Sequence, residues 1–137
     1  MELTQFEALR AYAKMMNTLS VAPLEPLLAD DFIYESQNVF SGLESKQAFL
    51  DYIAPKLQTI QNAGATVFAE MGMVSAYGKD QPCVVLAQHS KDNLVGLVLA
   101  SIAGDKVSRL DLCIVPPPQS AERRGDYLVL CLTMRSI

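Results

Sequence analysis

Arg109 and Asp111 lie two residues apart in a segment that alternates apolar and polar side chains, as a β-strand does. Residues at this spacing point to the same side of a sheet. A guanidinium could anchor the carboxylate or hydroxyl of a ligand, and a carboxylate whose pKa is raised by burial could act as a base. The structural alternative is an ion pair that shields the rim of a core.

Three further residue types could take part in chemistry. Tyr12 and Tyr34 could direct their hydroxyls at a ligand carbonyl, or they could be ordinary core tyrosines. Cys113 has no base predicted beside it and is expected to be an inert apolar side chain. His89 is the one histidine, and the expected register places it away from Asp111, at the surface or in an interface.

Composition excludes several classes of protein. The chain has 137 residues, enough for one domain, and 50% of them are apolar against 19% charged, which excludes a disordered chain. A net charge of −4 without a basic face argues against nucleic acid as a partner. The longest apolar run, residues 94–103, is too short to span a membrane, and the N-terminus resembles no targeting peptide. No membrane partner is therefore expected.

The cysteine and histidine counts bear on location and cofactors. Three cysteines without C-x-x-C spacing are typical of a reducing compartment, so a cytoplasmic location is predicted. A single histidine makes a zinc site of the usual ligand types implausible. Neither a metal nor another cofactor is expected.

Apolar spacing predicts three helices in the first half of the chain. The first begins at residue 4 or 5, where Thr4 and Glu7 fit a capping box. The second is short and opens at the prolines of residues 23–28. The third spans about residues 44–62, and Pro55 is expected to kink or split it.

Strand-like alternation dominates the rest of the chain. A first strand is expected at residues 32–37, before a turn at 40–42. Short loops then separate four strands, which should form an antiparallel meander: residues 66–77, 82–90, 94–103 and 106–115. Residues 1–118 are assigned to one domain and 119–137 to a C-terminal tail. In that tail a charged loop at 122–126 precedes an apolar stretch, 127–134, which is either a further strand or a dimer arm.

Hairpin register predicts which side chains share a face. Without bulges, Val98 faces Asp111 and Leu86 across neighbouring strands. One face then collects Met71, Met73, Leu86, Val98, Arg109, Asp111 and Cys113. The other face is also apolar, which favours a homodimer through this outer sheet face. A one-residue bulge, for instance at Gly72, would reverse part of the assignment.

The order of these elements resembles the nuclear transport factor 2-like superfamily, which includes ketosteroid isomerases and polyketide cyclase-like (SnoaL-like) proteins. The resemblance rests on residues 28–36 (LADDFIYES), on Ser41-Gly42 and on residues 12–17, and it covers residues 3 to about 116. It implies an α+β, cone-shaped fold in which three N-terminal helices pack on a curved antiparallel meander sheet around an apolar pocket.

The same resemblance allows the catalytic positions to be compared. Tyr12 matches the oxyanion tyrosine of the isomerases, whereas Ser36 stands at the place of the general-base aspartate and Val98 near that of the protonated aspartate. A serine cannot take a proton from carbon at neutral pH without a base beside it. Ketosteroid isomerase chemistry is therefore not expected.

Two readings of function follow, with a third kept open. The first is a protein that binds a small hydrophobic molecule in its cone. The second is an isomerase, dehydratase or cyclase-like enzyme with Asp111 as base and Tyr12 or Tyr34 as hydrogen-bond donor. The third is a protein-interaction module that uses the outer face and the tail. The predicted ligand-binding residues are Tyr12, Tyr34, Ser36, Met71, Met73, Leu86, Val98, Arg109, Asp111 and Cys113.

Overall fold

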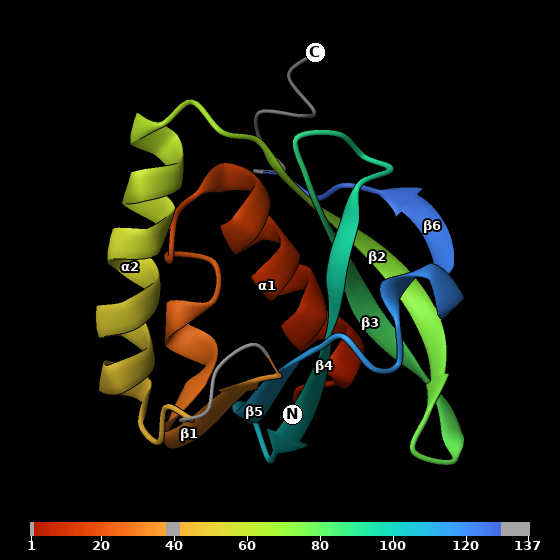
Figure 1. Cartoon of the computed structure of the whole chain (residues 1–137). Coiled ribbons are helices and arrows are strands. Elements are labelled where there is room, and N and C mark those ends of the chain that lie inside the picture. Colours follow the sequence, from red (N-terminus) through yellow and green to blue (C-terminus); the bar gives the residue numbers. More distant parts are fainter. Residues whose placement is uncertain (1, 38–41, 130–137) are drawn as a thin grey trace.

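Two helices pack on one face of a curved, six-stranded sheet (Figure 1). The computed structural model describes residues 2–37 and 42–129. The elements in chain order are α1 (Gln5–Thr18), η1 (Glu25–Leu27), β1 (Leu28–Ser36), α2 (Lys46–Asn62), β2 (Val67–Ala76), β3 (Lys79–Gln88), β4 (Leu94–Ala103), β5 (Lys106–Cys113), η2 (Pro118–Ser120) and β6 (Glu122–Asp126). The strand order is β1-β5-β4-β3-β2-β6, and the sheet is mixed because β1 runs parallel to β5.

The predicted start of the first helix is confirmed. The Thr4 hydroxyl accepts from the Glu7 backbone N–H at 3.0 Å, and the Glu7 carboxylate accepts from the Thr4 N–H at 3.0 Å. Two backbone donors that a helix start leaves open are thus satisfied by side chains. Local sequence alone determines where α1 begins.

The prediction of three helices is wrong. The proline-rich residues 23–28 form only the 3-10 turn η1, because β1 begins directly after it at Leu28 and leaves no room for a longer helix. α2 begins after its N-cap, Ser45, and continues through Pro55 without being split. Pro55 is exposed, so the carbonyl that it deprives of a donor can bond to water.

The main core lies between the helices and the inner face of the sheet. α1 packs across β2, β3 and β4, while α2 packs on β1. Fully buried side chains from all of these layers fill the space between them: Leu9, Met15, Phe32, Phe49, Leu57, Val84, Val98 and Leu110. Phe49 packs against both Phe32 and Tyr34 with ring centroids 5.1 Å apart.

One bulge reverses the predicted faces of β5. Ile102 pairs with Val107 as the turn predicts, but Ser101 pairs with Arg109, so Ser108 is an extra residue on β5. Beyond the bulge Asp111 faces Leu99 rather than Val98. The prediction that Arg109, Asp111 and Cys113 share a face with Val98 and Leu86 is therefore wrong, because one extra residue moves every following side chain to the other side.

The outer face of the sheet is largely covered by the chain itself. β5 and β6 lie on opposite sides of β4, β3 and β2, so the residues between them, 114–121, must cross the sheet (Figure 1). We call residues 114–121 the crossing segment; within it, η2 contacts β4 and Ala121 packs on a second apolar cluster. That cluster consists of Val74, Ala76, Cys83, Val85, Leu97, Leu99 and Cys113. These side chains are buried without a partner subunit.

The last strand is formed by the residues predicted to be a charged loop. β6 pairs with β2, and a buried carboxylate attaches it: Glu70 accepts from Arg123 Nε at 2.7 Å and from the Gly125 N–H at 2.6 Å. The Tyr127 hydroxyl donates to the same carboxylate at 3.0 Å. The expected strand or arm at 127–134 begins at residues without strand structure, and positions 130–134 lie outside the described residues.

A side chain of α1 takes the place of a further strand next to β2. The Asn17 amide donates to the Ala69 carbonyl at 2.9 Å and accepts from the Ala69 N–H at 2.8 Å. Asn17 also donates to the Leu128 carbonyl at 2.8 Å. The edge of β2 is thereby satisfied by Asn17 at one end and by β6 at the other. No helix among the described residues has the length and apolar character needed to cross a membrane.

Candidate functional site

The predicted site residues divide between two faces of the sheet. Tyr12, Tyr34 and Leu86 line a cavity between the helices and the inner face. Arg109, Asp111 and Cys113 line a hollow on the outer face. The sheet separates the two groups, so the structure does not bring Asp111 and Tyr12 together.

The inner site, which we call the tyrosine cavity, has a volume of about 280 Å³. Its walls are mostly apolar, and they come from α1, α2 and the sheet: Met16, Ile53, Ile60, Val67, Leu86, Val95 and Leu112. Four polar residues complete the lining: Tyr12, Tyr34, Lys56 and Gln88. A concave, apolar site with a few polar groups is typical of small-molecule binding, and this volume is near the lower end of the range for such sites.

Tyr12 lies at the buried end of the cavity. The side chain is 3% exposed, yet among the described residues no group hydrogen-bonds its hydroxyl. No buried side-chain nitrogen or oxygen of those residues lacks a partner, so this hydroxyl must face open space, which the cavity provides. Burial, with Tyr34 and Tyr52 nearby, raises the pKa of Tyr12 well above its usual value. The phenol is therefore neutral and can donate one hydrogen bond.

Tyr34 forms the wall next to Tyr12. Its ring packs on Tyr52 with centroids 5.9 Å apart, and burial is the main cause that raises its pKa. A hydrogen bond with Ser36 opposes that rise. Ser36 thus acts on the site through Tyr34, while its own position borders the outer hollow.

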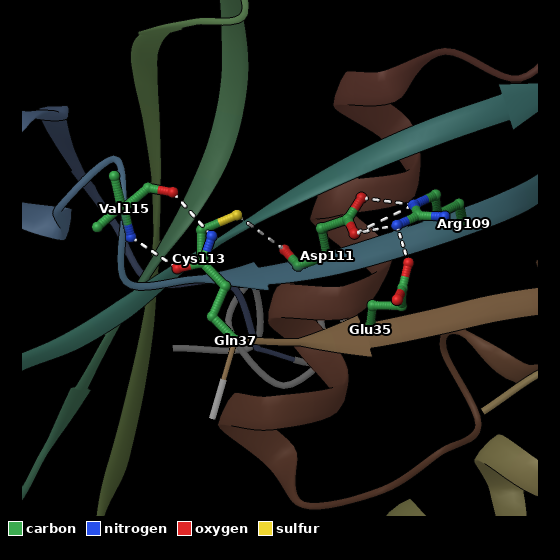
Figure 2. Close-up of polar contacts among 6 residues, drawn as sticks. All are labelled: Glu35, Gln37, Arg109, Asp111, Cys113 and Val115. Carbon is green, nitrogen blue, oxygen red and sulfur yellow. Dashed lines mark hydrogen bonds and ion pairs between the residues drawn. The ribbon is translucent and has the colours of Figure 1, made fainter. Parts of the chain in front are cut away.

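The outer hollow holds a cluster of three charged residues (Figure 2). Arg109 Nε lies 2.9 Å from Asp111 Oδ2, and Nη2 lies 2.9 Å from Oδ1. Arg109 Nη2 also pairs with Glu35, which lies in register with Asp111 across β1 and β5. Both oxygens of Asp111 are bound to a permanent cation, which opposes a role as a base.

Cys113 is the third predicted residue in the outer hollow. It is 1% exposed, and burial, followed by the nearby Asp111 carboxylate, raises the pKa of its thiol. A thiol with a raised pKa is a poor nucleophile at neutral pH.

Three predicted lining residues lie elsewhere. Met71 and Val98 are buried in the main core and line neither site. Met73 lies further along β2 and borders shallow surface hollows near Arg124. His89 is exposed, as expected.

Sequence reasoning missed Lys56 and Gln88 in the tyrosine cavity and Glu35 in the outer hollow. Lys56 lies three residues after Ile53 and four before Ile60, which also line the cavity, a spacing that places the three side chains on one face of α2. That spacing could have identified Lys56. The place of Glu35 depends on the pairing of β1 with β5, which no local pattern indicates. Among residues 2–37 and 42–129, no cluster of three histidine, cysteine, aspartate or glutamate side chains could hold a metal ion.

Comparison with known proteins gives likenesses of fold. No protein-family model matches the chain, and no curated protein does so either. A SnoaL-like protein of unknown function from Burkholderia thailandensis has a TM-score of 0.58 at 15% identity, with 91% of this chain and all of that chain covered (100%). A proposed ketosteroid isomerase from Kribbella flavida has a TM-score of 0.54 at 18% identity, covering 90% of this chain and 81% of its own.

A third solved structure is described as nuclear transport factor 2-like. A nuclear transport factor 2-like protein of unknown function from Cytophaga hutchinsonii has a TM-score of 0.54 at 9% identity, with 85% of this chain and 96% of that chain covered. Identities this low carry no information about activity, but the shared architecture extends over most of each chain. The predicted resemblance is confirmed at the level of architecture: this chain has the nuclear transport factor 2-like fold.

Proposed function

We propose that the protein binds a small, mostly apolar molecule in the tyrosine cavity. The observation that carries this proposal is Tyr12: the residue is buried, but its hydroxyl meets the cavity and has no hydrogen-bond partner among the described residues. A buried polar group is normally satisfied, so this one is suited to a ligand or a water. Apolar walls around it would supply most of the binding free energy.

Binding is better supported than turnover. None of the described residues that line the tyrosine cavity is a carboxylate, a histidine or a cysteine. The lining therefore offers hydrogen-bond donors but no group suited to take a proton near neutral pH. The enzymatic alternative, with Asp111 as base, loses support because Asp111 lies on the other face and is paired with Arg109.

A blocking substitution tests the proposal. Val95 is half-exposed at the cavity, so Val95→Trp should narrow the opening without disturbing the core. Val115→Trp is the matched control, since Val115 is exposed and belongs to the crossing segment on the other face. The measurement is a thermal-shift screen with single-ring ketones, hydroxy acids and phenols, and with one polyaromatic.

The expected result is specific to one variant. A ligand at 100 times its dissociation constant stabilises the folded state by about 2.7 kcal/mol. That shift should occur in the native protein and in Val115→Trp, and it should be lost in Val95→Trp. An equal shift in Val95→Trp, or no shift with any compound, would contradict binding in the tyrosine cavity.

We also propose a homodimer through the outer sheet face. Its contact area is smaller than the whole apolar outer face that the sequence predicted to be available. Because the crossing segment covers the apolar cluster, the large apolar side chains that stay exposed there, among the residues that the structure describes, are Tyr77, Ile114 and Val115. Sedimentation of the native protein should show a dimer, and Val115→Glu should show a monomer; Val95→Glu, on the helix side, is the control. A monomeric native protein would contradict this proposal. The cytoplasmic location stays a prediction.

A further inference from the structure

The charge in the lining of the tyrosine cavity is positive. Among the described residues that line it, Lys56 is the only charged side chain, although the protein as a whole has a net charge of −4. The other polar groups of the lining are the amide of Gln88 and the hydroxyls of Tyr12 and Tyr34. No carboxylate in this lining repels an anionic ligand, and one ammonium attracts it.

The polar groups of the lining are exposed at the opening of the cavity and buried at its other end. Lys56, Gln88 and Val95 are exposed, whereas Tyr12 and Leu86 are buried. The opening therefore carries the ammonium, and the buried end carries a neutral phenol. Apolar side chains separate these two polar ends.

The position of the Lys56 ammonium is fixed by Tyr52. Lys56 Nζ donates to the Tyr52 hydroxyl at 3.0 Å and lies 5.3 Å from the centre of that ring. An ammonium has three donors, so two remain for a ligand. Holding the long side chain in one place lowers the entropy lost when a ligand carboxylate binds to it.

From this arrangement, and resting on the proposed function, we infer that the ligand is a single-ring carboxylate with a hydroxyl or carbonyl group at its far end. The carboxylate lies at the opening beside Lys56, where it stays partly hydrated, and the ring lies between the apolar walls. The far polar group meets the Tyr12 hydroxyl. The opposite orientation would bury a charge against one neutral donor, which is much less favourable.

Calorimetric titration with three probes tests the inference. The probes are 4-hydroxyphenylacetate, its uncharged amide 4-hydroxyphenylacetamide, and phenylacetate, which lacks the far hydroxyl. The variants are Lys56→Gln and Tyr12→Phe. Lys46→Gln is the control, because Lys46 is also on α2 but does not line the cavity. In the native protein the acid should bind more tightly than the amide by about fivefold.

Lys56→Gln and Tyr12→Phe should each abolish a different ligand preference. Lys56→Gln should abolish the preference for acid over amide, and Lys46→Gln should retain it. Tyr12→Phe should abolish the preference for 4-hydroxyphenylacetate over phenylacetate, which should be about fivefold in the native protein. Because the Tyr12 hydroxyl has no partner among the described residues, its removal should leave the melting temperature nearly unchanged.

The outcomes distinguish this inference from the proposed function on which it rests. Equal binding of acid and amide, or an acid preference that survives in Lys56→Gln, overturns the inference while ligand binding itself stands. If no probe binds, the inference is overturned; if the thermal-shift screen of the native protein also gives no shift with any compound, the proposed function is overturned as well. Loss of the acid preference in Lys46→Gln would show that it arises from the general field of the protein, which also overturns the inference.

Discussion

Arg109 and Asp111 form a two-point ion pair along a single strand, with both guanidinium–carboxylate distances at 2.9 Å. Glu35 of the neighbouring strand binds the same guanidinium. Since Glu35 and Asp111 are in register, the cation separates two carboxylates that would otherwise repel each other. The guanidinium of Arg109 thus offsets a local repulsion between two carboxylates.

Removing the positive charge of Arg109 should leave the carboxylates of Glu35 and Asp111 to repel each other. We expect Arg109→Gln to lower the free energy of unfolding by about 1 kcal/mol, a modest value because the side chains are partly exposed. Adding Asp111→Asn should restore part of the loss. Urea denaturation of the single and double variants measures this. If the second substitution restores nothing, the two carboxylates do not repel each other as described.

Glu70 should hold β6 in place. The carboxylate is 3% exposed and accepts hydrogen bonds from Arg123, Gly125 and Tyr127. Glu70→Gln places an amide where only acceptors fit, and it should lower the free energy of unfolding by about 2 kcal/mol. Trypsin should then cleave faster after Arg123. Glu122→Gln, on the exposed surface, is the control, and equal effects of the two would refute the special role of Glu70.

Stability should fall in alkaline solution, in part through Cys83. Burial raises the pKa of its thiol to about 12 from a usual value of 9.0. The folded state therefore keeps a proton that the unfolded chain releases, so the stabilisation is complete below pH 9 and is lost between pH 9 and 12. Each pH unit in that window should remove up to about 1.4 kcal/mol.

Urea denaturation of Cys83→Ala from pH 7 to 10.5 measures this contribution. The variant should be less stable than the native protein at pH 7, because it leaves a cavity, but its stability should fall less steeply above pH 9. Parallel curves for the two proteins would show that Cys83 does not contribute to the pH dependence.

The turn between β2 and β3 offers a stabilising change. Tyr77 has a φ of 54° and Gly78 a φ of 80°, the left-handed pair of a type I′ turn, in which Asn-Gly is favoured. Tyr77 is 74% exposed, so Tyr77→Asn should raise the free energy of unfolding by about 0.5 kcal/mol. Thermal denaturation measures the change. A lower melting temperature would mean that contacts of the tyrosine outweigh its backbone strain.

Much of the fold could be predicted because its signals are local. The capping box of α1, the bounds of β4 and the Gly104-Asp105 turn each depend on a few adjacent residues, and the structure has them as predicted. The resemblance carried by residues 28–36 likewise predicted the fold. Local rules sufficed wherever the element was decided by its own side chains.

The rest depends on distant partners. The bulge at Ser108 has no glycine or proline to mark it, and it arises where β5 must pair with β1 and β4 together. That single residue moved Arg109, Asp111 and Cys113, three of the ten predicted ligand-binding residues, to the other face. β6 has no apolar alternation, and its attachment depends on Glu70, which lies 53 residues before Arg123 in the sequence. Neither feature can be read from a short stretch of sequence.

The crossing segment imposes an order on folding. Its path lies over β4 and ends at an edge that β2 provides, so it cannot settle before the hairpins of β2 to β5 have formed. Until then Val85, Leu97 and Leu99 remain open to water as a flat apolar surface. A folding intermediate that lacks the crossing segment would self-associate through this surface. The crossing segment covers this surface in the folded protein, so we expect a chain that ends near residue 113 to aggregate more readily.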